Sequence, residues 1–407
     1  MKWIEGGVCA AKGFQARGMH VGVKSHNPDK KDLALIVSDT LCAAAAVFTK
    51  NAVKAAPILV DLNHLQNGKA RAVVVNSGNA NACAPNGEKN AEKMCAAAAQ
   101  AIGCSQEDVL VSSTGVIGQE IKIDVIEQGM PELYGKLAAS LQGSDDAAHA
   151  IMTTDTVKKE VAVETVIGGK TVHMGGIAKG SGMIHPNMGT MLCFLTTDCA
   201  ISSQMIRSAL LETAAVSFNR ISVDGDTSTN DSCMVLANGL AGNAEITEKN
   251  EDYTAFVETL KALAIQLAKQ MASDGEGAKH LITCTVSEAE SVESAEIVAK
   301  SVISSTLTKA AIFGADANWG RVLCAMGYSG VAFDPDQVSV WFASAAGKIL
   351  VCEKGRGVDF NEDKAKEILT EHDIEILISM GAGQSECTCW GCDITYDYIK
   401  INGDYRT

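Results

Sequence analysis

The chain alternates between short apolar runs and segments with helical spacing, and this alternation limits the folds that it can adopt. Residues 72–75 and 109–112 are apolar runs typical of buried strands. The first run is followed by a polar segment typical of a loop, 76–81, and the second ends in residues 113–116. A helical pattern from about residue 89 to 101 separates the two strands. Strands that alternate with helices predict a mixed α/β protein with layered sheets.

The same alternation continues to the end of the chain. Residues 161–165 and 172–174 are typical of a hairpin, with Gly168 and Gly169 at its turn. One helix shows its apolar face at Phe256, Leu260, Leu263 and Leu267. Further expected elements are strands at 191–195 and 338–342, helices at about 203–216, 294–307 and 361–371, and strands at the end of the chain.

Length and composition favour a compact protein of two domains. The chain has 407 residues, of which 47% are hydrophobic, and it contains 37 glycines and no low-complexity tract. The alternating pattern restarts at Leu281. We therefore expect one domain over residues 1–279 and a smaller C-terminal α/β domain over residues 280–407.

Charge and hydropathy exclude two classes of partner. The net charge of −15 argues against nucleic acid, because phosphate contacts need clustered Lys and Arg. The chain lacks an apolar run of about 18 residues, and its start lacks the apolar core of a signal peptide. We expect no membrane contact and a cytoplasmic protein.

The chain contains 14 cysteines, most of them single residues within apolar runs. Free Cys in a reducing cell behaves as a small buried hydrophobe. Cys387, Cys389 and Cys392 form the one cluster, and their spacing could supply three thiolates to a metal. No second paired cluster lies near them in the sequence to complete a tetrahedral site, so we expect reduced thiols and no metal.

The segment 179–198 is a glycine-punctuated polar loop that runs directly into an apolar strand, and Thr190 lies at the junction after Gly189. If the Gly189–Thr190 bond were cut, Thr190 would hold a nucleophilic hydroxyl and a basic α-amine on one residue. From spacing alone, a buried Thr that opens a strand is the favoured interpretation, because Thr is common in strands.

Short sequence segments along nearly the whole chain, called blocks below, favour the interpretation of Thr190 as a nucleophile. Besides the segment around Thr190, they are 76–82, 113–118, 150–156, 219–231, 274–277, 314–321 and 390–407. With these blocks in this order, the chain resembles the ornithine acetyltransferase family of arginine biosynthesis, a relative of the N-terminal-nucleophile-like aminopeptidases. Such an order is far more specific than one short motif.

The resemblance implies a fold and a set of site residues. The fold is an N-terminal-nucleophile-like αββα sandwich, and self-cleavage gives an α segment, 1–189, and a β segment, 190–407. Thr190 is the implied nucleophile, and Thr114 and Gly115 are the implied oxyanion pair. The implied substrate contacts, the last of them from the C-terminal tail, are Thr153, Lys179, Thr190, Glu276, Asn402 and Thr407.

The reaction implied by the resemblance is acetyl transfer from N2-acetylornithine to glutamate through an acetyl ester on Thr190. It needs no cofactor, although acetyl-CoA is a possible co-substrate, and the fragments are expected to assemble as an α2β2 heterotetramer. Two alternatives remain open: an amidase or aminopeptidase that passes its acyl group to water, and a small-molecule-binding α/β protein in which Thr190 has no catalytic role.

Three further residues near these blocks receive a structural interpretation. His185 replaces a residue that is more usually alanine in the family, and we interpret it as a tolerated substitution near the cut. Asp226 and Asp231 lie in an Asp-rich loop, and we interpret them as turn and N-cap carboxylates.

Overall fold

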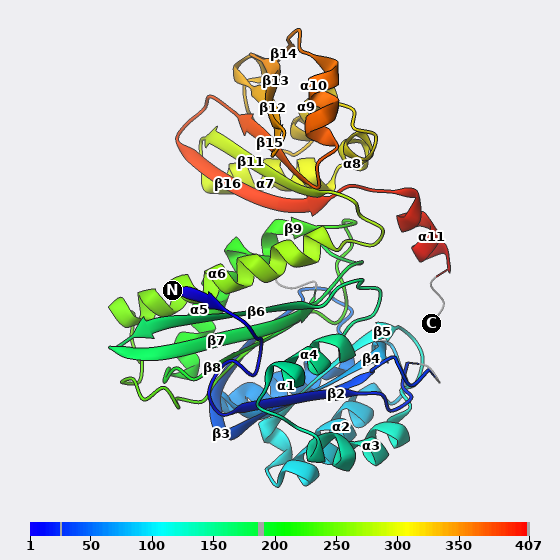
Figure 1. The fold of residues 1–407 in the computed structure, drawn as a ribbon, viewed down its shortest axis with the longest axis vertical. Helices are drawn as coiled ribbons and strands as arrows, with labels where there is room; N and C mark the ends of the chain where they lie inside the picture. Colours follow the sequence, from blue (N-terminus) through cyan, green and yellow to red (C-terminus); the bar gives the residue numbers. More distant parts are fainter. Residues whose placement is uncertain (25–26, 186–190, 405–407) are drawn as a thin grey trace.

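The computed structural model describes residues 1–24, 27–185 and 191–404, and strands within these ranges pair into two sheets (Figure 1). The first sheet has nine strands. Their spatial order is β1 (Lys2–Ile4), β6 (Lys159–Ile167), β7 (Lys170–Lys179), β8 (Leu192–Thr197), β10 (Ser232–Ala237), β3 (Leu33–Phe48), β4 (Lys69–Asn79) and β5 (Val109–Val116), with β2 (Phe14–Met19) paired to β3. The α/β class is confirmed.

The long strand β3 divides the first sheet into two halves. Its register with β4 shifts between Val37 and Cys42, so that residues 33–37 pair with β2 and β4 and residues 43–48 pair with β10. Side chains from both halves then meet in one apolar cluster, to which Ile36 and Val73 contribute from one half and Phe194 and Met234 from the other. The two halves therefore face each other.

Helices cover the outer face of each half (Figure 1). One half carries α1 (Ala56–His64), α2 (Gly87–Ile102) and α3 (Ile123–Gly135), and the other carries α5 (Ser203–Val216) and α6 (Glu251–Ser273). Along β3, Leu35 contacts the first helix layer and Ile36 the interior. Along β8, Phe194 contacts the interior and Leu195 the α5–α6 layer. This alternation builds the expected αββα sandwich.

Phe194→Ala should therefore destabilise the sandwich interior, because its ring is only 1% exposed between the half-sheets. We expect a loss of about 3–5 kcal/mol in the free energy of unfolding, measured by urea titration of the purified protein. Val166→Ala, at a position that is 65% exposed, is the control and should change stability by less than about 0.5 kcal/mol. Equal effects of the two substitutions would contradict this packing.

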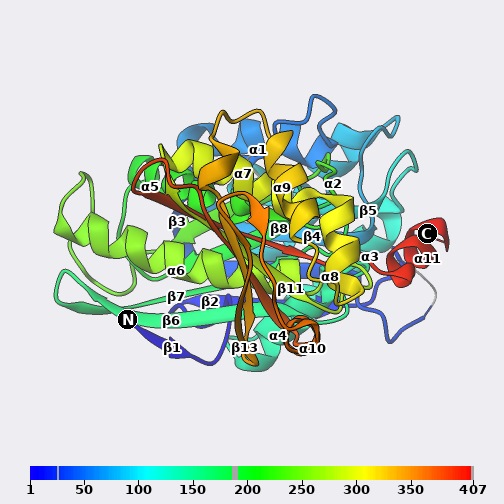
Figure 2. The ribbon, with the colours of Figure 1, turned by 90° about the horizontal axis from the view of Figure 1, so that it is seen from above.

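The second sheet has seven strands. Their order is β14 (Arg356–Gly357), β13 (Gly347–Glu353), β12 (Ser339–Ser344), β15 (Asp373–Ser379), β11 (Leu281–Ala289), β16 (Ser385–Cys392) and β9 (Ile221–Ser222). Its core is shared with α7 (Val292–Ser304), α8 (Thr306–Phe313), α9 (Trp319–Gly327) and α10 (Glu362–Leu369), which cover it as seen in Figure 2. The division into domains at residue 279 remains a prediction. The second sheet does not come entirely from residues after 279, because its edge strand β9 is formed by Ile221–Ser222.

Local signals located several elements correctly. The helix expected at 203–216 is α5, and the hairpin of β6 and β7 turns at Gly168 and Gly169, whose φ angles are 57° and 71°. Positive φ at both central residues is the requirement of a type I′ turn, which glycine meets without strain.

Two local expectations were wrong, and a third was incomplete. Residues 76–79 continue β4 instead of forming a loop, because they pair with β5. The helix expected at 294–307 is two helices, since Ser305 has an extended backbone and its side chain caps α8 by accepting from the Thr308 N–H. The strands expected after the helix at 361–371 are present as β15 and β16, but they are followed by a helix, α11 (Tyr396–Asp404), which was not expected.

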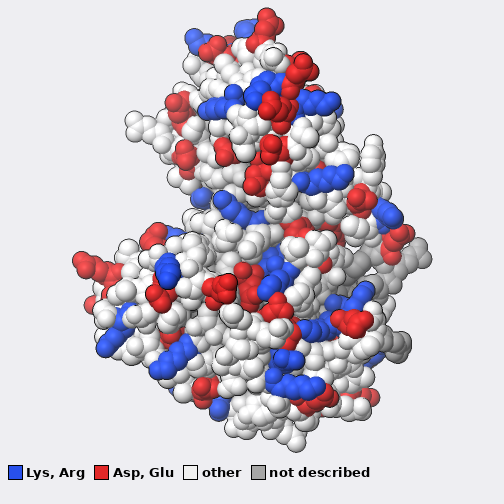
Figure 3. Space-filling model, viewed as in Figure 1, with Lys and Arg blue, Asp and Glu red and all other residues white. Residues whose placement is uncertain are grey.

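Two surface properties bear on partners. On the face shown in Figure 3, Lys and Arg residues are interspersed with Asp and Glu residues and form no broad basic surface. Within the described ranges, we found no helix with both the length and the apolar character needed to cross a bilayer.

Candidate active site

One cavity of about 140 Å³ collects six of the residues that the resemblance implied. They come from the end of β5, the loop after α4 (Leu141–Ala150), the end of β7, the loop after α6, and α11: Thr114, Gly115, Thr153, Lys179, Glu276 and Asn402. An adjoining cavity shares Thr114 and Lys179 and reaches Met191, the residue that follows Thr190. Gly189, Thr190 and Thr407 lie outside the described residues.

Larger hollows occur elsewhere on the described surface, with volumes of about 560, 700 and 840 Å³. None of them contains any of these six residues. The convergence of chemically suited side chains, and not volume, therefore identifies the candidate site.

Gly115 occupies a position that admits no side chain. Its φ is +136°, and a β-carbon there would lie 2.3 Å from the Gly78 carbonyl carbon and 2.5 Å from the Asn79 nitrogen. Only glycine tolerates both this conformation and this approach of β4. The Asn230 side-chain amide donates to the carbonyls of Ala80 (2.6 Å) and Ser113 (2.9 Å) and so fixes the strand end that carries Thr114.

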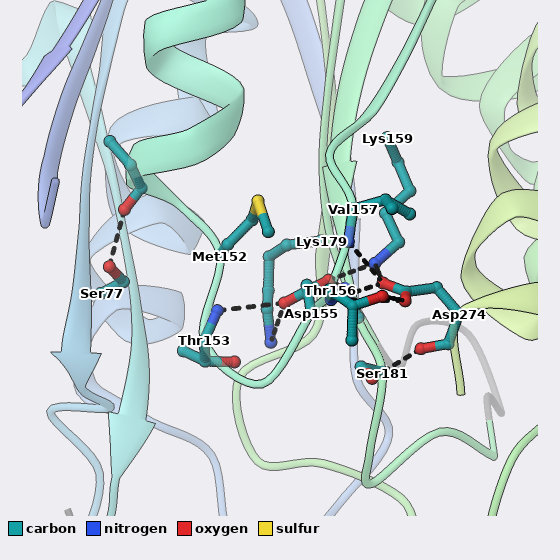
Figure 4. A network of polar contacts seen from close by, with 12 residues as sticks. Ser77, Met152, Thr153, Asp155, Thr156, Val157, Lys159, Lys179, Ser181 and Asp274 are labelled. Atoms are coloured by element: carbon teal, nitrogen blue, oxygen red, sulfur yellow. Dashed lines mark hydrogen bonds and ion pairs between the residues drawn. The ribbon is translucent and has the colours of Figure 1, made fainter. Parts of the chain in front are cut away.

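Lys179 supplies a buried cation to the cavity. Its Nζ lies 3.9 Å from Oδ2 of Asp155, which also accepts from the Thr153 N–H at 3.0 Å (Figure 4). Burial lowers the pKa of Lys179 from its ordinary value, and the charge of Asp155 opposes that shift. Burial alone raises the pKa of Asp155, but the charges of Lys179 and Lys159 outweigh burial and hold that pKa well below its usual range.

Glu276 supplies a buried carboxylate to the same cavity. Its Oε2 accepts from Nδ2 of Asn402 at 2.7 Å, so that α11 reaches back to the loop after α6. Its backbone N–H donates to the Ser181 carbonyl at 2.9 Å. Gly182 leaves room for the carboxylate, because a β-carbon there would lie 2.4 Å from Glu276 Cδ. A cation and a carboxylate in one cavity suit a ligand that carries both charges, such as an amino acid.

Sequence reasoning missed part of the cavity wall. Asp231 was interpreted as a turn or N-cap carboxylate, but it precedes β10, and its buried side chain lines the small cavity beside Met191. Burial raises the pKa of Asp231 well above its ordinary value. Ser228 and Asn230 line both cavities. All three residues lie within the block 219–231, so the family resemblance of that block could have indicated that they line the site.

His185 and Asp226 do not line the cavity of about 140 Å³ that contains Lys179 and Glu276. The Nδ1 atom of His185 is 3.0 Å from Oγ of Ser222, and burial lowers the pKa of the imidazole. The backbone N–H of Asp226 donates to Oδ1 of Asp224 at 3.2 Å, which fits a turn residue.

The three clustered thiols do not all lie on one side of their strand. Cys387 and Cys389 contact the core of the second sheet, whereas Cys392 contacts the core beside α6, because an odd offset along β16 reverses the side chain. Within the described ranges, no group of three or more His, Cys, Asp or Glu side chains is arranged to hold a metal ion.

Comparison with known proteins decides the family. A family model described as the ArgJ family matches residues 15–407. The chain belongs to the ArgJ family. This ArgJ family member is 49% identical to the arginine biosynthesis bifunctional protein ArgJ of Symbiobacterium thermophilum, and the match covers 100% of each chain. The protein of the same name from Caldanaerobacter subterraneus is 47% identical, again over 100% of each chain.

One solved structure is similar to a shorter stretch of this chain. It is a crystal structure of ornithine acetyltransferase complexed with ornithine from Mycobacterium tuberculosis. It is 38% identical, with a TM-score of 0.42, over 46% of this chain and 96% of that chain. The family matches confirm the resemblance that the sequence blocks indicated and associate this ArgJ chain with enzymes of arginine biosynthesis.

Proposed function

We propose that this ArgJ family member transfers the acetyl group of N2-acetylornithine to glutamate through an acetyl ester on Thr190. The observation that carries the proposal is the single cavity lined by Thr114, Gly115, Lys179 and Glu276, beside the strand that begins after Thr190. Those residues combine two oxyanion donors, a carboxylate-binding cation and an ammonium-binding carboxylate.

Self-cleavage at Gly189–Thr190 prepares the nucleophile. The Thr190 hydroxyl attacks the Gly189 carbonyl, the acyl group shifts from nitrogen to oxygen, and water hydrolyses the resulting ester. The freed α-amine, with a reference pKa of about 7.7–8.0, then acts as the general base for the Thr190 hydroxyl. The α segment, 1–189, and the β segment, 190–407, share the sandwich core, and we propose that they remain together in an α2β2 heterotetramer.

Each half-reaction passes through a tetrahedral oxyanion. The Thr190 hydroxyl attacks the acetyl carbonyl of acetylornithine, and the Thr114 hydroxyl and Gly115 N–H donate to the developing negative charge. Collapse releases ornithine, which takes the proton held on the α-amine. The amine of glutamate then attacks the acetyl ester and regenerates the Thr190 hydroxyl. Lys179 receives the α-carboxylate, and Glu276 receives the side-chain ammonium of ornithine.

The exchange needs no cofactor, because the ester stores the acetyl group between half-reactions. We further propose that acetyl-CoA serves as a second acetyl donor and that the reaction takes place in the cytoplasm. Thr153, Asn402 and Thr407 complete the proposed substrate contacts.

The proposal is tested with purified protein, acetylornithine and glutamate. Formation of N-acetylglutamate should be faster than release of acetate to water, and acetyl-CoA is assayed separately as the donor. Faster hydrolysis than transfer would contradict the transferase and favour the amidase alternative.

Asn402→Ala should raise the KM for acetylornithine by about tenfold, because the Glu276 carboxylate loses the hydrogen bond that orients it. Steady-state kinetics at varied acetylornithine checks this. Ile399→Ala removes a 65% exposed side chain from the same helix and should change the KM by less than about twofold. An unchanged KM for acetylornithine in Asn402→Ala would contradict the proposed role of the Asn402–Glu276 hydrogen bond in substrate binding.

A further inference from the structure

We infer that Asp155, Lys159 and Asp274 form a buried ionic cluster that positions the substrate-binding residues of the cavity (Figure 4). This inference rests on the proposed function, because the residues being positioned are its proposed substrate contacts. The three residues are positioning residues, since none of them lines the cavity of about 140 Å³ that contains the proposed substrate contacts.

The cluster joins the loop before β6 and the start of that strand to the loop after α6, which is distant in the sequence. Lys159 begins β6, and its ammonium donates to Oδ1 of Asp155 at 2.5 Å and to Oδ2 of Asp274. Lys159 is 0% exposed, and the two carboxylate residues are 8% exposed each. Burying three charges gives little net stability, because desolvation offsets their attraction. A role in fixing geometry accounts for the cluster better than a role in stability.

Asp155 fixes two cavity residues directly. Its Oδ2 accepts from the Thr153 N–H, and its Oδ1 accepts from the Gly180 N–H at 2.8 Å, immediately after Lys179. The loop that carries Thr153 is therefore held against the end of β7.

Asp274 fixes the other side of the cavity. Its carboxylate accepts from the Thr156 N–H at 3.0 Å, which fastens the far end of the loop that carries Thr153. Its carbonyl accepts from the Ser181 hydroxyl at 2.6 Å, and the Ser181 carbonyl accepts from the Glu276 N–H at 2.9 Å. One cluster thus sets the positions of Thr153, Lys179 and Glu276 relative to one another.

The cluster also controls the charge of Lys179. The charged groups that face Lys179 are Asp155, Lys159, Glu276, Asp231 and Lys24. Asp155 is the first of the anions that favour the protonated form, while burial and the neighbouring lysines oppose it. Without the Asp155 charge, the Lys179 pKa falls further, so Lys179 loses its proton at a lower pH. Binding of an α-carboxylate then weakens as the pH rises.

Asp155→Asn is the main test, because it keeps the side-chain shape and removes the charge. We expect the KM for glutamate to rise about tenfold near pH 7 and to rise further by about pH 9, while kcat changes by less than about threefold. The wild-type KM should show a weaker dependence on pH over the same range. A purely structural role would not produce this pH-dependent split between KM and kcat.

Two further variants keep the test decisive. Lys158→Met removes the neighbouring lysine, whose ammonium pairs with Asp145 and Glu160 at the surface, and should leave the KM within about twofold of wild type. Asp274→Asn should also raise the KM for glutamate. If Asp155→Asn does not fold, the KM of Asp274→Asn tests the positioning role of the cluster. Folded variants with a wild-type KM at both pH values would overturn the inference. Wild-type protein that transfers no acetyl group would instead contradict the proposed function itself.

Discussion

Replacing Thr190 with alanine should leave the chain whole and abolish acetyl transfer. The substitution removes the hydroxyl that attacks the Gly189 carbonyl, and without the cut the general base of the second reaction is never formed. On a denaturing gel, the wild-type protein should run as two fragments and the variant as one chain of 42.6 kDa. Transfer activity should fall by about 10⁴-fold or more, since nucleophile and base are lost together.

Thr190→Ser is the matched control for this experiment. Serine retains a hydroxyl on the first residue of the fragment, so the chain should still be cut and should keep measurable transfer activity. A Thr190→Ala chain that is cut at the same bond, or that transfers acetyl at the wild-type rate, would contradict the assignment of Thr190 as the nucleophile.

Gly115→Ala should reduce kcat by about 10²–10³-fold. A β-carbon at this position collides with the backbone of β4, 2.3 Å from the Gly78 carbonyl carbon, so the strand end must shift. The shift displaces the Gly115 N–H and the Thr114 hydroxyl from the position that the oxyanion will occupy. Steady-state kinetics measures the effect on kcat, and circular dichroism checks that the variant is folded.

Gly118→Ala separates site geometry from backbone strain. Gly118 also has a positive φ, +81°, but no atom lies within 4 Å of the β-carbon that alanine would add. Alanine there costs about 1–2 kcal/mol of conformational strain and should change kcat by less than about threefold. Similar kcat values for Gly115→Ala and Gly118→Ala would show that the proposed oxyanion geometry is wrong.

The fold was predictable where its signals are local. The hairpin of β6 and β7 follows from two glycines between two strand-like runs, and α5 occupies the residues at which a helix was expected. The sandwich could not be derived in this way. It depends on the shift in β3 between Val37 and Cys42, which only the partner strands β4 and β10 reveal.

The site shows the same contrast. Thr114, Lys179 and Glu276 were placed in one site by resemblance to a family, because no local pattern connects residues so far apart. Lys158 and Lys159 are adjacent lysines in the sequence, yet the first is a surface residue and the second is fully buried. One of the two carboxylate partners of Lys159 is Asp155, four residues before it, but the other, Asp274, lies 115 residues away. The sequence around Lys159 therefore could not reveal the whole cluster.

Trapping the acetyl-enzyme tests the central claim most directly. Wild-type protein is mixed with acetylornithine in the absence of glutamate, and the intact mass of each fragment is measured. The account predicts that the β segment, 190–407, gains one acetyl group on Thr190 as ornithine is released, and that added glutamate removes this group as N-acetylglutamate. Consumption of acetylornithine and glutamate with no acetyl group ever carried on Thr190 would contradict it.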